Sequence, residues 1–231
     1  MCGRAKLSTP GDELAEALGL VEVPELEPRY NIAPTQPIPI VKAESPRIEL
    51  VRWGLIPWFT PQKPLPDPAG AGMPQAINGR AESIASKRLF ADAFRRRRCV
   101  VVIDGFYEWQ KQGRAKRPHH IRRSDGAPLP LAGVWDRWVT ADGEVVESCA
   151  IVTVEAREPV RTIHDRMPAI LGDEARAIWL DPSRAEPDLH AVLKHPPPDL
   201  VMNAVSMFVN NPAHEGPECV RPDGGTALSL F

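Results

Sequence analysis

Short apolar blocks and alternating apolar and polar positions fill most of the chain, a spacing typical of β-strands. The block CVVVIDGFYEWQ at 99–110 predicts a buried strand that bends at Asp104-Gly105 and continues beyond the bend. Further strands are expected at 118–123, 129–139 and 146–156. The Asp142-Gly143 pair predicts a hairpin turn between the last two, because this dipeptide suits tight two-residue turns.

A pair of strands around a turn is predicted at 37–57. Pro37 and Pro39 lie in the first of them, and proline cannot donate a ladder hydrogen bond. We therefore expect this first strand at an edge of its sheet.

Helical spacing is limited to short segments. In STPGDELAEALGL, Thr9 suits an N-cap, Pro10 the first helical position and Asp12 a capping box, while Gly19 ends the helix. Segment 81–98 is also expected to be helical, and four terminal arginines complement its dipole. Its apolar side would carry Ile84, Leu89, Ala93 and Phe94. Two more short helices are expected at 172–180 and 187–193.

Together these elements predict an α+β fold. Strands dominate, hairpins are common and no regular β-α-β alternation occurs, so we expect a curved, mostly antiparallel, barrel-like sheet with short flanking helices. A single domain over 2–231 is expected, because the Pro/Gly-rich loop at 59–74 has strand-like segments on both sides. The 26 prolines of the 231-residue chain favour ordered loops over long helices.

Composition narrows the class of protein. No apolar run approaches transmembrane length and no signal-peptide pattern opens the chain, so a cytoplasmic protein is expected. The cysteines lie far apart without a C-x-x-C pair, which argues against bound metal and disulfides. These are Cys2, Cys99, Cys149 and Cys219. No dinucleotide or P-loop glycine pattern is present, and we expect no cofactor.

Charge is unevenly distributed, although the net charge is only −2. Residues 80–123 contain 13 Lys and Arg against four Asp and Glu, so the remainder of the chain is acidic. This asymmetry predicts an electropositive face suited to nucleic acid, with a solvated helix end and a basic loop as the plainer interpretation.

Candidate chemistry begins at Cys2 in MCGR. Removal of Met1 would leave an α-amine and a thiol on one residue, two carbons apart. An aldehyde can condense with the amine, and the thiolate can then close a thiazolidine ring. The plainer alternative is a small buried hydrophobe.

Three further segments carry polar groups in suggestive places. In INGRAES, Asn78 offers an amide, Arg80 a fork for phosphate, and Glu82 a carboxylate that can hold this arginine. In DGFYEWQ, Glu108 stands between Tyr107 and Trp109, which raises the prospect of a general acid beside base-stacking rings. In TIHDRMPAIL, His164 between apolar neighbours can shuttle protons. Each segment also has a structural interpretation: a turn, an outward strand glutamate, or a satisfied histidine.

The combination closely resembles one family. The motifs MCGR, YNIAPTQ, RWGLIPWF, NGRAES, CVVVIDGFYEW and TIHDRMPAIL, in this order from Cys2 to about Asn210, resemble the SOS-response-associated peptidase (SRAP) family. Its members are abasic-site processing proteins that act on single-stranded DNA. The resemblance implies a covalent cross-link between the N-terminal cysteine and the aldehyde of an abasic site.

Site residues follow from the same resemblance. It implies that the catalytic set is Cys2, Asn78, Glu108 and His164. DNA contacts are expected from Arg4, Trp53, Trp58, Arg80, Tyr107, Trp109 and Arg166. Gly79 and Ser83 depart from the alanine and threonine common in the family, but neither change removes a catalytic side chain.

Other activities stay open at this point. An N-terminal-nucleophile amidotransferase also begins Met-Cys-Gly, an autopeptidase would remove Met1, and a non-catalytic module would only bind single-stranded DNA. The expected partner is single-stranded DNA that contains abasic sites, bound by a monomer without a membrane or a metal.

Overall fold

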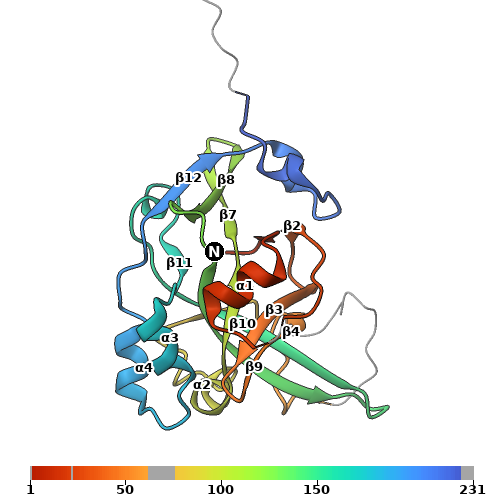
Figure 1. Cartoon of the computed structure of the whole chain (residues 1–231), viewed down its shortest axis with the longest axis vertical. Helices are drawn as coiled ribbons and strands as arrows, with labels where there is room; N and C mark the ends of the chain where they lie inside the picture. The colour runs from red at the N-terminus through yellow and green to blue at the C-terminus, as the bar shows by residue number, and fades with distance from the viewer. Residues whose placement is uncertain (1, 22, 62–75, 225–231) are drawn as a thin grey trace, which may run out of the picture.

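A computed structural model describes residues 2–21, 23–61 and 76–224 (Figure 1). Its strands are β1 (Ala5–Leu7), β2 (Arg29–Ile32), β3 (Pro37–Lys42), β4 (Ser45–Trp53), β5 (Asn78–Arg80), β6 (Arg98–Ile103), β7 (Gly105–Gln112), β8 (Ala115–Arg123), β9 (Leu129–Val139), β10 (Val145–Glu155), β11 (Arg166–Pro168) and β12 (Leu200–Ala204). Its helices are α1 (Gly11–Leu18), α2 (Ala91–Arg96), α3 (Asp173–Leu180) and α4 (Glu186–Val192). Short 3-10 turns are η1 (Val160–Thr162), η2 (Met207–Asn210) and η3 (Pro217–Val220).

Five strands close on themselves as a small barrel. Their order is β10-β4-β3-β6-β9, and β9 pairs back with β10 from Val139 opposite Val145 to Gly133 opposite Ile151. Only the β10–β4 pair in this ring is parallel. β5 and β11 extend the sheet from β10. The expected α+β fold on a curved, mostly antiparallel, barrel-like sheet is therefore confirmed.

A second sheet has the order β12-β8-β7-β1-β2 (Figure 1). It is joined to the barrel at the predicted bend, where β6 ends and β7 begins. Gly105 is required there because a methyl group on it would lie 2.4 Å from Nε2 of His120. The carboxylate of Asp104 accepts hydrogen bonds from Lys6, Ser8 and Thr9, so the bend also anchors the start of the chain.

Two details of the predicted helices are corrected. Thr9 donates its hydroxyl to Asp104 instead of capping α1, and Pro10 takes the N-cap position. Of segment 81–98, only Ala91–Arg96 is α-helical, and the residues before it form turns. Gly19 does end α1, in the left-handed conformation at φ 64°.

The position of β3 is also corrected. This strand lies inside the barrel sheet, between β4 and β6, and not at an edge. β6 pairs only with Ile40–Lys42, beyond both prolines, so the missing donors of Pro37 and Pro39 do not interrupt that ladder.

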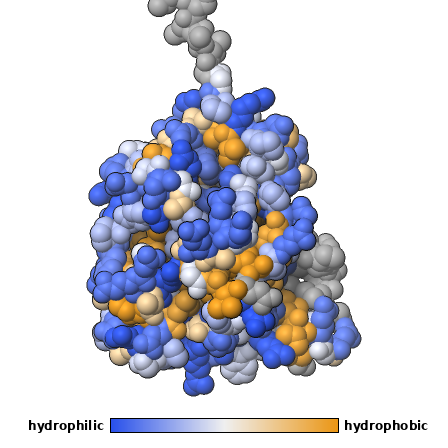
Figure 2. All heavy atoms as spheres, in the orientation of Figure 1, coloured by the Kyte–Doolittle hydropathy of each residue, from blue (hydrophilic) through white to orange (hydrophobic). Residues whose placement is uncertain are grey.

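The remaining predicted elements hold. The hairpin at Asp142-Gly143 joins β9 and β10, and α3 and α4 cover the two C-terminal helical segments. The expected loop at 59–74 falls mainly on residues 62–75, outside the described residues. On the face drawn in Figure 2, hydrophilic residues predominate and hydrophobic ones form separate groups.

Candidate active site

Cys2 lies at the seam between the barrel and the second sheet. It lies three residues before the start of β1 and is completely buried. Asn78, the first residue of β5, donates its side-chain amide to the carbonyl oxygen of Cys2 at 2.8 Å. A carbonyl can only accept, so this bond fixes the orientation of the amide. Its Oδ1 is buried and has no hydrogen-bond partner among the described residues, which leaves an acceptor for a ligand.

Glu108 lies close enough to act on the Cys2 thiol. It is buried on β7, where it pairs with His119 of β8. Burial first, and then the negative charge of Glu108, raise the pKa of the Cys2 thiol well above its usual range. The thiol is therefore neutral near pH 7, and a carboxylate stands near it to exchange protons.

His164 lies just before β11. Its Nδ1 lies 2.9 Å from the backbone nitrogen and 3.2 Å from the carbonyl oxygen of Arg166. Asp165 Oδ1 lies 3.0 Å from the same Nδ1. These contacts hold His164 to β11, while β5 and β11 both pair with β10 around Thr153.

The carboxylate of Glu82, which the sequence predicted to hold Arg80, binds Arg166. The Arg166 guanidinium donates two hydrogen bonds to Glu82, at 2.8 and 2.9 Å, and one to the carbonyl oxygen of Thr153 at 2.6 Å. The bond from Arg166 lowers the pKa of Glu82. Glu82 thus fixes Arg166, a correction to the expected pairing, and Arg80 is exposed.

Arg4 and Asn31 form the centre of a group that we call the terminal hub: Arg4, Asn31, Tyr107, Trp109 and the segment 209–214. Arg4 Nη1 donates to Asn31 Oδ1 at 2.7 Å and to the carbonyl of Val209 at 2.9 Å. The amide of Asn31 donates to carbonyls of the same segment, at 2.8 Å in the shortest case. The hub joins the first residues of the chain to segment 209–214, which lies close to its C-terminal end.

The aromatic residues divide into buried and accessible ones. Trp53 and Tyr107 are fully buried, with Trp53 Nε1 donating to Ile77 and the Tyr107 hydroxyl to Tyr30. Both rings pack inside the protein in this structure, and their expected contacts with DNA stay a prediction. Trp58 is 59% exposed, and Trp109 is half-buried beneath the guanidinium of Arg4.

Part of the basic segment at 80–123 serves the fold. Arg98 is buried and donates to backbone carbonyls, including those of Phe94 and Trp179. Arg97 pairs with Asp92 and Asp136. The sequence analysis includes these two arginines in the predicted electropositive face. Because both are bound by groups of the protein itself, they do not contribute to such a face.

Sequence reasoning missed the roles of Asn31 and Asp104. Each is a polar residue within or directly after an apolar strand, and that signal was present in the chain.

All four cysteines are free. Among the described residues, no cluster of His, Cys, Asp or Glu is arranged to hold a metal ion. No helix in the described ranges has the length and apolar character to span a membrane.

Comparison with known proteins defines the class. A solved structure of a Bacteroides thetaiotaomicron protein has the same fold, with a TM-score of 0.82 and 24% identity over 96% of this chain and 100% of that one. YoqW of Bacillus subtilis (strain 168), named an abasic site processing protein, is 34% identical over 229 residues, which cover 95% of this chain and 99% of YoqW. HMCES of Xenopus tropicalis, with the same description, is 34% identical over 84% of this chain and 66% of its own.

The model of the SOS response associated peptidase (SRAP) family matches residues 1–212. The chain belongs to this family, and the resemblance inferred from its motifs is confirmed.

Proposed function

We propose that this protein processes abasic sites in single-stranded DNA by forming a covalent cross-link through Cys2 after Met1 is removed. The observation that carries the proposal is the grouping of Cys2, Asn78 and Glu108 at one seam, with Asn78 bonded to the Cys2 backbone. The descriptions of YoqW and HMCES as abasic site processing proteins support the same substrate.

The proposed reaction has two steps. The α-amine of Cys2 adds to the aldehyde carbon of the ring-opened sugar, and loss of one water gives an imine. The water carries the aldehyde oxygen and two amine hydrogens. The sulfur then bonds to the same carbon while the thiol proton passes to the imine nitrogen, which closes a thiazolidine. Ring closure is intramolecular and therefore fast.

The charges at the seam suit this order of steps. Burial and Glu108 keep the Cys2 thiol protonated, so its proton is available for the imine nitrogen. Glu108 is both the base that takes up a proton and, once protonated, the general acid that assists opening of the sugar and loss of water. The orphan oxygen of Asn78 accepts a hydrogen bond from the sugar or from the new terminal amine.

His164 serves the reverse reaction in this proposal. Its imidazole can carry and donate a proton, and contacts of Nδ1 with Asp165 and with the backbone of Arg166 hold the ring in place. Return of that proton to the sugar oxygen favours ring closure and release of the cross-link. His164→Ala should therefore slow release more than formation, as measured by chasing the adduct with excess abasic DNA. Faster release by this variant would contradict the role.

DNA contacts come from residues with accessible groups. Arg80 and Arg166 lie on strands that flank β10, and Arg80 is exposed for phosphate. Trp58 and Trp109 offer faces for bases of a single strand, in which stacking needs no particular sequence. Arg4 lies over Trp109 and steadies it. We further propose that the protein is a cytoplasmic monomer that joins the nucleoid when bound to DNA.

A denaturing gel with an oligonucleotide containing one abasic site tests the proposal. Wild-type protein should give a heat-stable shifted band, and Cys2→Ala should give none while still binding undamaged single strands. An amidotransferase, an autopeptidase or a simple binding module would give no such band. Mass spectrometry of the N-terminus is the companion measurement, since a retained Met1 blocks the amine and rules the mechanism out.

A further inference from the structure

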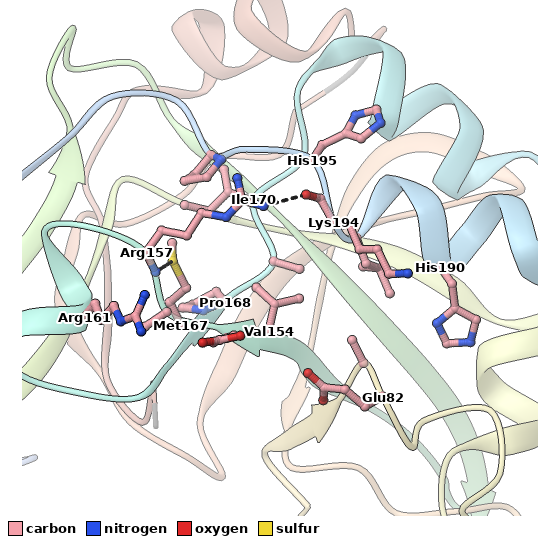
Figure 3. Close-up of a pocket in the computed structure, with 16 residues that line it drawn as sticks. Glu82, Val154, Arg157, Arg161, Met167, Pro168, Ile170, His190, Lys194 and His195 are labelled. Atoms are coloured by element: carbon pink, nitrogen blue, oxygen red, sulfur yellow. Dashed lines mark hydrogen bonds between the residues drawn. The ribbon is translucent and has the colours of Figure 1, made fainter.

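A cavity of about 410 Å³ lies between β10, β11 and the end of α4 (Figure 3). Its apolar lining comes from Val154, Met167, Ile170 and Leu193. No step proposed above uses it. Its volume is in the range of sites that hold small organic ligands.

The cavity is continuous with the surroundings of His164. Glu82, Glu155 and Arg161 line both the cavity and an adjoining hollow that contains His164 and Arg166. The lining also includes Ala81, three residues beyond Asn78 on the same segment. At ~3.3 Å per residue of strand, this distance is on the order of 10 Å. The edge of the cavity therefore lies on the order of 10 Å from Asn78, the residue that contacts the Cys2 backbone.

Cations are concentrated at one part of the wall. Arg157 and Arg161 reach the same side of the cavity, next to Met167 (Figure 3). The guanidinium of Arg157 is fixed by a 2.7 Å bond to the carbonyl of Lys194, while Arg161 and Lys194 are exposed. The charge of Glu82 is balanced by its two hydrogen bonds to Arg166. Of the remaining charged lining residues, Glu155 is the one carboxylate against the cations Arg157, Arg161 and Lys194, so the lining favours an anion.

An apolar wall with cations at one side matches the chemistry of a nucleoside phosphate. A base has a planar apolar face, and its phosphate is an anion that arginine binds through paired N–H groups. We propose that this cavity holds the nucleotide next to the abasic site in the same DNA strand, with its base on the apolar wall and its phosphate at Arg161. This inference rests on the proposed function, because Cys2 holds the strand in place.

The first test uses charge reversal at Arg161. Arg161→Glu should weaken binding of undamaged single-stranded DNA about tenfold and flatten its salt dependence. The same change at Arg47, which is exposed on β4 of the barrel, is the matched control and should have a much smaller effect. Equal effects of the two variants would overturn the proposal.

Two further arms identify the ligand. With Cys2→Ala protein, which forms no cross-link, replacing the base on one side of the abasic site with a tetrahydrofuran spacer should lower the affinity, and the same replacement on the other side should not. Equal losses from the two replacements would contradict a single cavity. Binding of free dAMP that Arg161→Glu abolishes, without a change in strand affinity, would assign the cavity to a free nucleotide and overturn the proposal. Absence of a cross-linked band from wild-type protein refutes the proposed function separately, because these binding measurements need no covalent step.

Discussion

The five-strand barrel and the second sheet are stabilised by different kinds of contact. The barrel encloses fully buried aliphatic side chains, among them Ile40, Val101, Leu131 and Ile151. The second sheet adds Phe106 and Ile121 to the same core, whereas its outer side has a smaller apolar cluster around Tyr107 and depends on the terminal hub. Apolar burial is spread over many residues, whereas the hub relies on a few directional bonds.

This difference separates a scaffold from a site. Cys2 and Glu108 belong to the second sheet and its entry, while Asn78, His164 and Arg166 are attached to β10 of the barrel. The candidate site therefore requires that the two sheets stay in register with each other. A change inside the barrel should lower stability, and a change at the seam should alter chemistry.

The largest expected effect on stability is in the barrel. Leu131→Ala removes a fully buried side chain from β9 and should lower the free energy of unfolding by about 2–5 kcal/mol, because it leaves a cavity. Denaturant unfolding measures this loss. The adduct-forming rate of the folded fraction should stay near the wild-type rate. A rate loss larger than the loss of folded protein would show that the barrel does more than support the site.

At the seam, Glu108→Gln should separate chemistry from stability. The substitution keeps the shape and removes the titrating group, so adduct formation should slow roughly 10²-fold. A time course on denaturing gels measures the rate. Glu144→Gln, on the exposed β9–β10 hairpin, is the control and should react like wild type. If Glu108→Gln keeps the wild-type rate, Glu108 is not the acid–base group, even where Cys2 is the nucleophile.

In the hub, Asn31→Ala tests the few directional bonds. It removes the bonds that Asn31 makes with Arg4 and with carbonyls of segment 209–214, which should cost about 1–3 kcal/mol of unfolding free energy. Thermal unfolding measures the cost, with Asn203→Ala on the exposed face of β12 as the control. Because Arg4 follows Cys2 by two residues, adduct formation should slow as well. Equal stability of the two variants would show that the hub is redundant.

Sequence alone predicted the barrel better than the seam. Strand periodicity and the Asp142-Gly143 turn reflect local physics, and they are visible in any short window. β3 can lie inside the sheet because β6 pairs only with the part of β3 that follows its prolines, and this depends on the register of the two strands. Local pattern carries no information on that register.

At the site, the sequence-based predictions were wrong where a side chain bonds to a partner that is distant in the chain. Nearness in sequence favoured Glu82 with Arg80, but pairing of β5 and β11 with β10 brings Glu82 to Arg166. Thr9 fits a helix cap locally, yet Asp104 provides a stronger charged acceptor from the other sheet. The burial of Trp53 and Tyr107 could not be foreseen from the sequence, because it depends on how the two sheets pack. The motif resemblance grouped the catalytic candidates; Asn78 contacts the Cys2 backbone, and the charge of Glu108 acts on the Cys2 thiol.

The smallest expected effect is at Asp104, where the two sheets join, and it depends on pH. Burial alone would raise the pKa of Asp104, but the bonds from Lys6, Thr9 and Ser8 outweigh it and lower the pKa. A carboxyl with a lowered folded pKa stabilises the protein above its unfolded pKa, near 3.9, and this stability is lost as the pH falls through the folded value. Asp104→Asn should therefore cost about 1–2 kcal/mol at pH 7, and the difference from wild type should shrink below about pH 4. Urea unfolding of both proteins at several pH values measures this difference. A difference that stays constant down to pH 2.5 would mean that shape, and not the charge of Asp104, holds the second sheet to the barrel.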